Sequence, residues 1–145
     1  MKLKYFLLLL LILPLALTSC SFDKDDEPTP DISKDPAGTV IINFTESDEW
    51  YSLGYGIGFY YRPGFNMYAS DGQIYMIGPV KNIASITKKD IPTTGWSSQA
   101  AAIVGYGYVL AGWHSNYAAL YVDSEIKSTN GGVYGYVIKV LPLNY

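Results

Sequence analysis

The sequence predicts an all-β fold, a small antiparallel β-sandwich or a partly open barrel, formed by residues 37–145. Three observations lead to this prediction. The span contains several short runs of β-branched and aromatic residues, strong turn signals separate these runs, and helical periodicity is scarce. A span of this length suits one domain with one hydrophobic core.

Runs of β-forming residues mark the expected strands, which are residues 39–44, 55–61, 73–77, 101–110, 117–126 and 133–141. Turn-forming sequences lie between them, at residues 62–64, 71–72, 94–95 and 130–132. The turn Asn130-Gly131-Gly132 joins two convincing strands and predicts a β-hairpin.

Two segments are less clear in type. Residues 80–87 are apolar at positions 80, 83 and 86, which fits either a strand or a short helical turn. The alanine-rich run that starts at Gln99 favours a helix locally, but Gly105 and Gly107 follow at once. Glycine costs ~1 kcal/mol at a helix position, so we expect no helix there.

The segment 117–126 has two chemically distinct faces. Its even positions are mostly apolar: Ala118, Leu120, Val122 and Ile126. Its odd positions are polar or amphipathic: Tyr117, Tyr121, Asp123 and Glu125. Because side chains alternate between the two faces of a strand, we expect the first set in the core and the second toward solvent.

Three short stretches place glycine beside tyrosine, at residues 54–57, 105–108 and 133–136. Their unequal spacing excludes a solenoid or propeller repeat. We expect them to mark bends, or places where an aromatic ring or another backbone lies against the glycines of a neighbouring strand.

The first residues have the composition of a secretory signal. Lys2 and Lys4 precede an apolar run at residues 5–17, and small residues then lead to Cys20. The apolar run is shorter than the ~20 residues that span a bilayer, so a permanent transmembrane helix is the weaker alternative. We therefore assign residues 1–19 to a signal peptide.

Leu17-Thr18-Ser19-Cys20 resembles the bacterial lipobox, in which an aliphatic residue and two small residues precede a cysteine. The resemblance implies cleavage before Cys20, a thioether-linked diacylglycerol on its sulfur, and acylation of the new amino terminus. Two or three acyl chains, such as palmitate, hold a protein firmly in a bilayer. Lipidation would also account for the single cysteine of the chain.

Residues 20–36 predict a disordered acidic tether after the lipidated cysteine. The segment carries six acidic residues, two lysines and three prolines, and it cannot bury enough apolar surface to fold. Within it, residues 23–27 resemble the surface-export signal of Bacteroidetes lipoproteins. The resemblance implies an outer-membrane protein that faces the cell exterior; a solvated linker on the periplasmic face is the alternative.

The C-terminal half resembles a group of small Bacteroidetes lipoproteins of unknown function. The similar stretches are residues 117–122, residues 128–132 and a closing strand that ends near Leu141-Pro142. Because that group has no established activity, the resemblance implies no site residues.

Charge and residue content argue against several kinds of function. Residues 37–145 carry seven acidic and six basic residues, so no basic stripe is present to follow a nucleic acid. His114 is the only histidine, and the chain has no Gly-x-Ser-x-Gly motif. We expect no catalytic residues, no metal site and no cofactor.

Two groups of carboxylates are possible sites. Asp123 and Glu125 are expected on one strand face, at a separation within the range of a glycosidase pair. Glu46, Asp48 and Glu49 offer oxygen ligands for calcium, although no EF-hand spacing is present. A solvated strand face and a solvated loop are the preferred interpretations.

Aromatic residues are the one compositional excess, with nineteen of them in residues 37–145. Exposed aromatic clusters mark binding surfaces, and we expect Trp113, Tyr117 and Tyr121 to form one for a glycan or a surface protein. The sequence thus predicts a non-enzymatic binding domain anchored through Cys20. The alternatives are an envelope-assembly component without a small-molecule ligand and a small glycan-processing enzyme.

Overall fold

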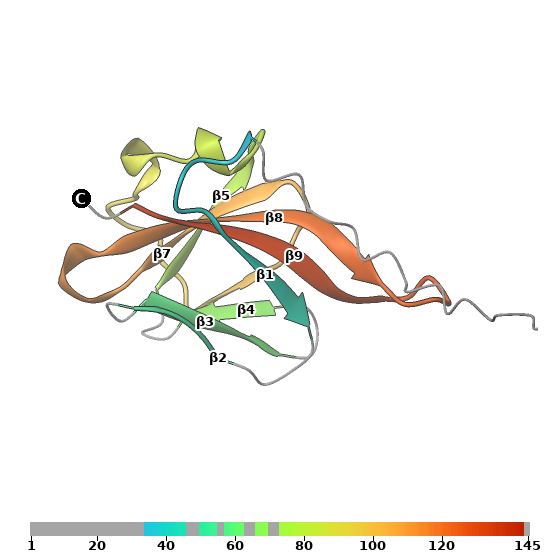
Figure 1. The fold of residues 1–145 in the computed structure, drawn as a ribbon. Helices are drawn as coiled ribbons and strands as arrows, with labels where there is room; N and C mark the ends of the chain where they lie inside the picture. Colours follow the sequence, from blue (N-terminus) through green and yellow to red (C-terminus); the bar gives the residue numbers. More distant parts are fainter. Residues whose placement is uncertain (1–33, 46–49, 55–56, 63–65, 70–72, 144–145) are drawn as a thin grey trace, which may run out of the picture.

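The structure is a computed structural model that describes residues 34–45, 50–54, 57–62, 66–69 and 73–143. Two antiparallel sheets pack face to face, which confirms the predicted all-β sandwich (Figure 1). Both sheets are open, with strand orders β1-β9-β8-β7-β5 and β2-β3-β4-β6. The signal peptide, Cys20 and the acidic residues at 46, 48 and 49 lie outside the described residues.

The larger sheet has five strands. They are β1 (Val40–Thr45), β5 (Ile74–Pro79), β7 (Tyr106–Ala111), β8 (Tyr117–Lys127) and β9 (Val133–Pro142). The predicted hairpin is confirmed, because β8 and β9 pair directly and Ser128 N–H donates to the Gly132 carbonyl at 2.9 Å. Gly131 adopts a φ of 82°, a left-handed conformation that glycine tolerates.

The smaller sheet has four strands, and two of them were not predicted. They are β2 (Trp50–Gly54), β3 (Ile57–Arg62), β4 (Asn66–Ala69) and β6 (Gln99–Ala101). The sequence prediction missed β2 and β4. It also joined β6 to β7 as one strand, whereas residues 102–105 turn the chain from one sheet to the other.

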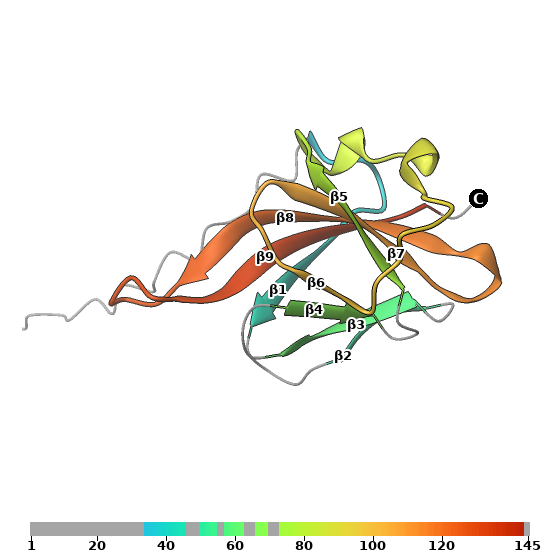
Figure 2. The ribbon, with the colours of Figure 1, turned by 180° about the vertical axis from the view of Figure 1, so that it is seen from behind.

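Three 3₁₀ turns complete the described elements: η2 (Ile83–Ser85), η3 (Lys88–Asp90) and η4 (Trp113–Ser115). The segment 80–87 is therefore a loop with a short helical turn, one of its two predicted conformations. The connection that carries η2 and η3 then descends to β6 in the other sheet (Figure 2). No helix among the described residues is long and apolar enough to cross a membrane.

The main core fills the space between the two sheets. Its largest fully buried side chains include Tyr108, Phe44 and Met67. The Tyr108 hydroxyl donates to the Ala101 carbonyl at 2.7 Å and accepts from Ile103 N–H at 3.1 Å. These bonds tie β7 of the larger sheet to β6 of the smaller one, and they satisfy a hydroxyl that would otherwise be buried without a partner.

A second core lies on the other face of the larger sheet, under the connection that carries η2 and η3. Its buried members are Ile83, Ile86, Val109, Ala119 and Leu143. The expectation that the odd face of residues 117–126 points to solvent is therefore wrong over the first half of β8. The alternation of residues along β8 does not predict that this face is buried, because the segment that covers it is distant in the sequence.

Candidate functional site

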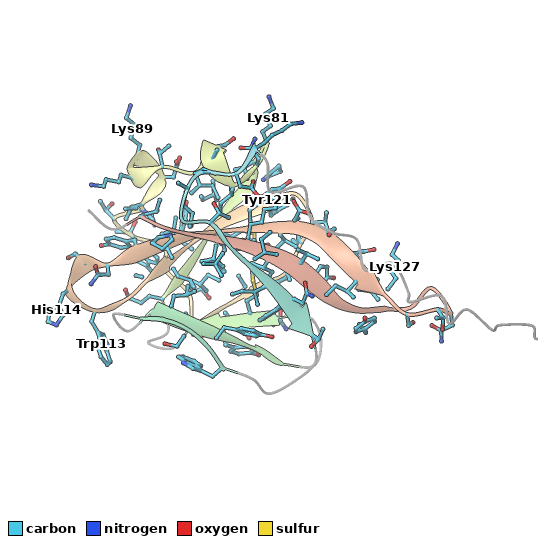
Figure 3. The ribbon with its side chains drawn as sticks, viewed as in Figure 1. Lys81, Lys89, Trp113, His114, Tyr121 and Lys127 are labelled. Atoms are coloured by element: carbon cyan, nitrogen blue, oxygen red, sulfur yellow. The ribbon has the colours of Figure 1, made fainter. Side chains whose placement is uncertain are left out.

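The three aromatic residues predicted to form a binding patch do not share one surface. Trp113 is 60% exposed in the turn between β7 and β8, whereas Tyr117 and Tyr121 are half-buried against the second core. Tyr117 stacks on Trp96 with ring centroids 6.2 Å apart and planes inclined by 21°. Figure 3 places Trp113 at one end of the molecule and Tyr121 over the middle of the larger sheet.

The turn at Trp113 has an unusual backbone. His114 and Ser115 have φ angles of 55° and 59°, a left-handed region that non-glycine residues seldom occupy. The Asn116 amide holds the turn by donating to the Trp113 carbonyl at 2.7 Å. Beside it lies a cavity of about 290 Å³, which His114, Ser115, Asn116 and Tyr117 help to line.

The two carboxylates of the possible glycosidase pair have different partners in the larger sheet. A β-bulge between Val122 and Ser124 interrupts the side-chain alternation of β8. Glu125 pairs with Tyr136, a member of the main core, whereas Asp123 contacts Lys139. Both carboxylates nevertheless line one shallow hollow of about 550 Å³ along β8.

Each of these carboxylates also has a lysine partner. Asp123 lies 3.1 Å from the Lys139 ammonium, and Glu125 lies 3.0 Å from that of Lys127. Each carboxylate thus contacts a cation, whereas the two carboxylates of a glycosidase flank one scissile bond. The arrangement suits two structural ion pairs better than an acid–base pair.

Lys139 also joins the N-terminal strap, residues 34–39, to the larger sheet. Its ammonium lies 2.9 Å from Asp35, and each side chain is 8% exposed. Burial lowers the pKa of Lys139, but hydrogen bonds and charge from Asp35 and Asp123 outweigh burial and raise it above 10.5. Residues 34–36, which the sequence analysis gave to the tether, are thus part of the folded domain.

The outer face of the smaller sheet carries an aromatic row that the sequence analysis missed. In the strand register, Trp50 lies opposite Tyr60, Tyr60 opposite Tyr68, and Tyr68 opposite Gln99. Directly opposed residues project from the same face of a sheet. Met67 belongs to the main core and Tyr51 packs against it, so the side chains of Trp50 and Tyr68 face away from the core.

The Trp50 side chain packs against Gly58 of β3. A Cβ added to Gly58 on the neighbouring strand would lie 2.5 Å from one indole carbon of Trp50 and 2.9 Å from another. The ring thus covers the bare glycine, while the side chain stays 48% exposed.

Polar residues border the row, and Arg62 lies opposite Asn66 in the strand register. Ser52 and Gln99 are exposed, and Asn66 and Tyr68 are partly exposed. Hydroxyl and amide groups beside a flat aromatic surface can hydrogen-bond a ligand whose apolar face stacks on the ring. The residue pattern of segments 50–54 and 66–69 indicated an exposed aromatic face, but the sequence analysis did not assign these segments to strands.

Within the described part of the chain, no three histidine, cysteine, aspartate or glutamate residues cluster as a metal site requires.

The comparisons with known proteins identify no relative. No family model matches the sequence, and neither the search of curated proteins nor the search of solved structures found a match.

Proposed function

We propose that this chain is a lipid-anchored lipoprotein of the outer membrane, facing the cell exterior, whose β-sandwich is a non-enzymatic binding module. The anchor rests on the sequence Leu17–Cys20 and on the resemblance of residues 23–27 to a surface-export signal. Both lie outside the residues that the structure describes.

The observation that carries the binding role is the separation of two features onto opposite faces of the sandwich. The N-terminal strap, which continues from the tether, is held on the outer face of the larger sheet by Asp35 and Lys139. The exposed Trp50 lies on the outer face of the smaller sheet. Figure 1 shows the strap and β2 on opposite sides of the molecule.

This arrangement supports a module that presents a surface away from its anchor. A tether that joins one face leaves the opposite face accessible to a ligand outside the membrane. Large aromatic side chains exposed together on a sheet surface are typical of binding sites.

Fatty-acid labelling in cells tests the anchor. Radiolabelled palmitate should mark the wild-type protein and should not mark Cys20→Ala; equal labelling of the two proteins would contradict lipidation. Added protease should degrade the protein on intact cells as fully as in lysed cells. Alanine at Asp25, Asp26 and Glu27 together should reduce that sensitivity, whereas the control Asp31→Ala should preserve it.

A turnover assay tests the non-enzymatic part of the proposal. The purified protein should release no reducing ends from polysaccharides such as cellulose, xylan or starch. Turnover that disappears in Asp123→Asn would instead support the glycan-processing enzyme.

A further inference from the structure

We infer that a second copy of this chain pairs with the open edge of β8 at residues 124–128, so that two domains on one membrane join their larger sheets edge to edge. The contact is an antiparallel pairing of identical segments about a two-fold axis at Ile126. The inference concerns a surface that the proposed function does not use, and it rests on that function only for the membrane anchor.

The first argument is that the last part of β8 has a strand partner on one side only. The pairing of β7 with β8 ends at Gly107 opposite Tyr121. One further bond follows, in which Gly105 N–H donates to the Val122 carbonyl at 2.8 Å. Among the described strands, only β9 pairs with β8 beyond that point, and Figure 1 shows the β8–β9 hairpin projecting past the other strands. An open edge presents backbone N–H and C=O groups that a further strand can pair with.

The second argument is that space is available beside this edge. The shallow hollow of about 550 Å³ along β8 is lined by Asp123, Ser124, Glu125 and Lys127, and by Val104 from the connection between β6 and β7. Val104 is 43% exposed. Because Val104 directly precedes the residue that bonds to Val122, the hollow lies on the side of β8 where β7 has ended. A strand from another copy can occupy this position.

The third argument is that the edge is complementary to itself in charge. In an antiparallel pairing centred on Ile126, Glu125 of each copy lies directly opposite Lys127 of the other. Opposed residues share a face with Cβ atoms about 5 Å apart, and opposite charges there stabilise the pairing. Within one copy, Glu125 and Lys127 lie 3.0 Å apart and are 36% and 57% exposed. Two copies therefore bring four accessible charges together with alternating sign.

The charges also select the register. An antiparallel pairing centred on Glu125 would place the two glutamates opposite each other. A pairing centred on Ser124 would place Asp123 opposite Glu125. Like charges directly opposite each other destabilise a pair of strands, so the register centred on Ile126 is favoured over both.

The fourth argument is the direction of the two anchors. Antiparallel strands of one sheet are related by a two-fold axis perpendicular to the sheet, so the same face of each copy points the same way. Asp35 and Lys139 hold the N-terminal strap on the outer face of the larger sheet. In the pair, both straps therefore lie on one side, from which both tethers can reach the same membrane, and both smaller sheets lie on the other side.

The size of the contact determines where the pair should form. At ~3.4 Å per residue and a sheet spacing of ~10 Å, the edge covers about 17 by 10 Å. A stable dimer in solution needs ~800 Å² on each partner, so we expect no stable pair in dilute solution. Anchoring in one membrane raises the effective concentration of the copies, which favours a weak contact without any new interaction.

Formaldehyde cross-linking on intact cells, followed by immunoblotting, tests the pairing with the full lipid-anchored chain. We expect a band at twice the mass of the mature protein. Glu125→Lys places lysine opposite lysine twice in the pair, so the dimer fraction should fall about fivefold or more, although this variant has an additional amine to cross-link. Lys127→Glu places glutamate opposite glutamate and should have a similar effect.

Mixing the two single variants separates pairing between copies from the ion pair within one copy. Cells that make both Glu125→Lys and Lys127→Glu, each with its own epitope tag, should contain a mixed dimer at about the wild-type level, because each lysine again lies opposite a glutamate. Neither chain has its own pair between positions 125 and 127, so this recovery requires contact between copies. Lys89→Glu is the matched control, since it reverses the charge of an exposed lysine on η3 and should leave the dimer fraction unchanged (Figure 3).

Four results would overturn the pairing. They are absence of the doubled band in cells where palmitate labelling succeeds, a doubled band that both single variants retain, a dimer that forms only after residues 28–33 of the tether are deleted, and a cross-link to a different protein that Glu125→Lys abolishes. Thermal unfolding of each variant verifies that a loss of the dimer is not a loss of fold. Because labelling reports on the anchor and the doubled band on the pairing, failure of one is distinguishable from failure of the other.

Discussion

Lys139 and Asp35 form an ion pair with a nitrogen–oxygen distance of 2.9 Å, across residues more than one hundred positions apart in the chain. Lys139 lies on β9, near the C-terminus, and Asp35 lies on the N-terminal strap. The pair thus closes the strap onto the larger sheet, and Asp123 contributes a second carboxylate to the same ammonium at 3.1 Å.

Breaking this pair should destabilise the domain. Asp35→Ala leaves the Lys139 ammonium, which is 8% exposed, with Asp123 as its one remaining counter-ion among the described residues. Removing one partner of a buried ion pair costs about 3–5 kcal/mol. Urea unfolding followed by circular dichroism should show the loss. The control is Lys127→Ala, which breaks the exposed pair with Glu125 and should cost less than about 1 kcal/mol. Equal losses of stability in the two variants would contradict a buried ion pair between Asp35 and Lys139.

The domain should lose stability at alkaline pH. Burial raises the pKa of the Tyr108 hydroxyl from 10.0 to about 12. The pKa of Lys139 is also raised, above 10.5. A group whose pKa is higher in the folded state contributes stability that is complete below its unfolded pKa and is lost as the pH rises through its folded pKa. For both groups that window opens above pH 10.

Urea midpoints measured from pH 8 to pH 12 should therefore fall on the alkaline side. Tyr108→Phe removes one of the two titrating groups, so its midpoint should fall less steeply between pH 10 and pH 12 than that of wild type. Identical slopes for the two proteins would show that Tyr108 does not couple to folding.

The same hydroxyl supplies a prediction at neutral pH. Tyr108→Phe removes the donor to the Ala101 carbonyl and the acceptor for Ile103 N–H. A buried polar group that loses its partner costs about 1–3 kcal/mol. The loss should appear in the free energy of unfolding at pH 7. Tyr134→Phe is the control: Tyr134 is 39% exposed, and its variant should unfold as wild type does.

Local patterns predicted the C-terminal half of the fold well. The hairpin of β8 and β9 follows from period-two alternation and from Asn130-Gly131-Gly132, both of which act between residues close in sequence. Strands β2 and β4 were missed because each has only a few residues and carries aromatic residues on both faces or on its outer face. Such a segment lacks the apolar-and-polar contrast that marks a strand.

The candidate site was harder to predict for a related reason. Tyr117 and Tyr121 have the pattern of a solvent-facing row, yet the connection through η2 and η3 covers them. The bulge at Asp123 likewise interrupts the alternation from which a common face for Asp123 and Glu125 was expected. Trp50 and Tyr68 come to share one face only through the pairing of β2, β3 and β4, so their row is visible in the fold and not along the chain.

Gly58 should be necessary for the packing of Trp50 against β3. A Cβ at this position would lie 2.5 Å from the Trp50 indole and 3.0 Å from the Tyr51 carbonyl oxygen, so Gly58→Ala must displace the ring or the strand. We expect altered tryptophan fluorescence and a lower urea midpoint than that of wild type. Gly132→Ala is the control, since its added Cβ would meet only ordinary contacts at 3.4 Å, and it should unfold as wild type does. An unchanged spectrum and midpoint for Gly58→Ala would mean that the indole does not pack against this glycine.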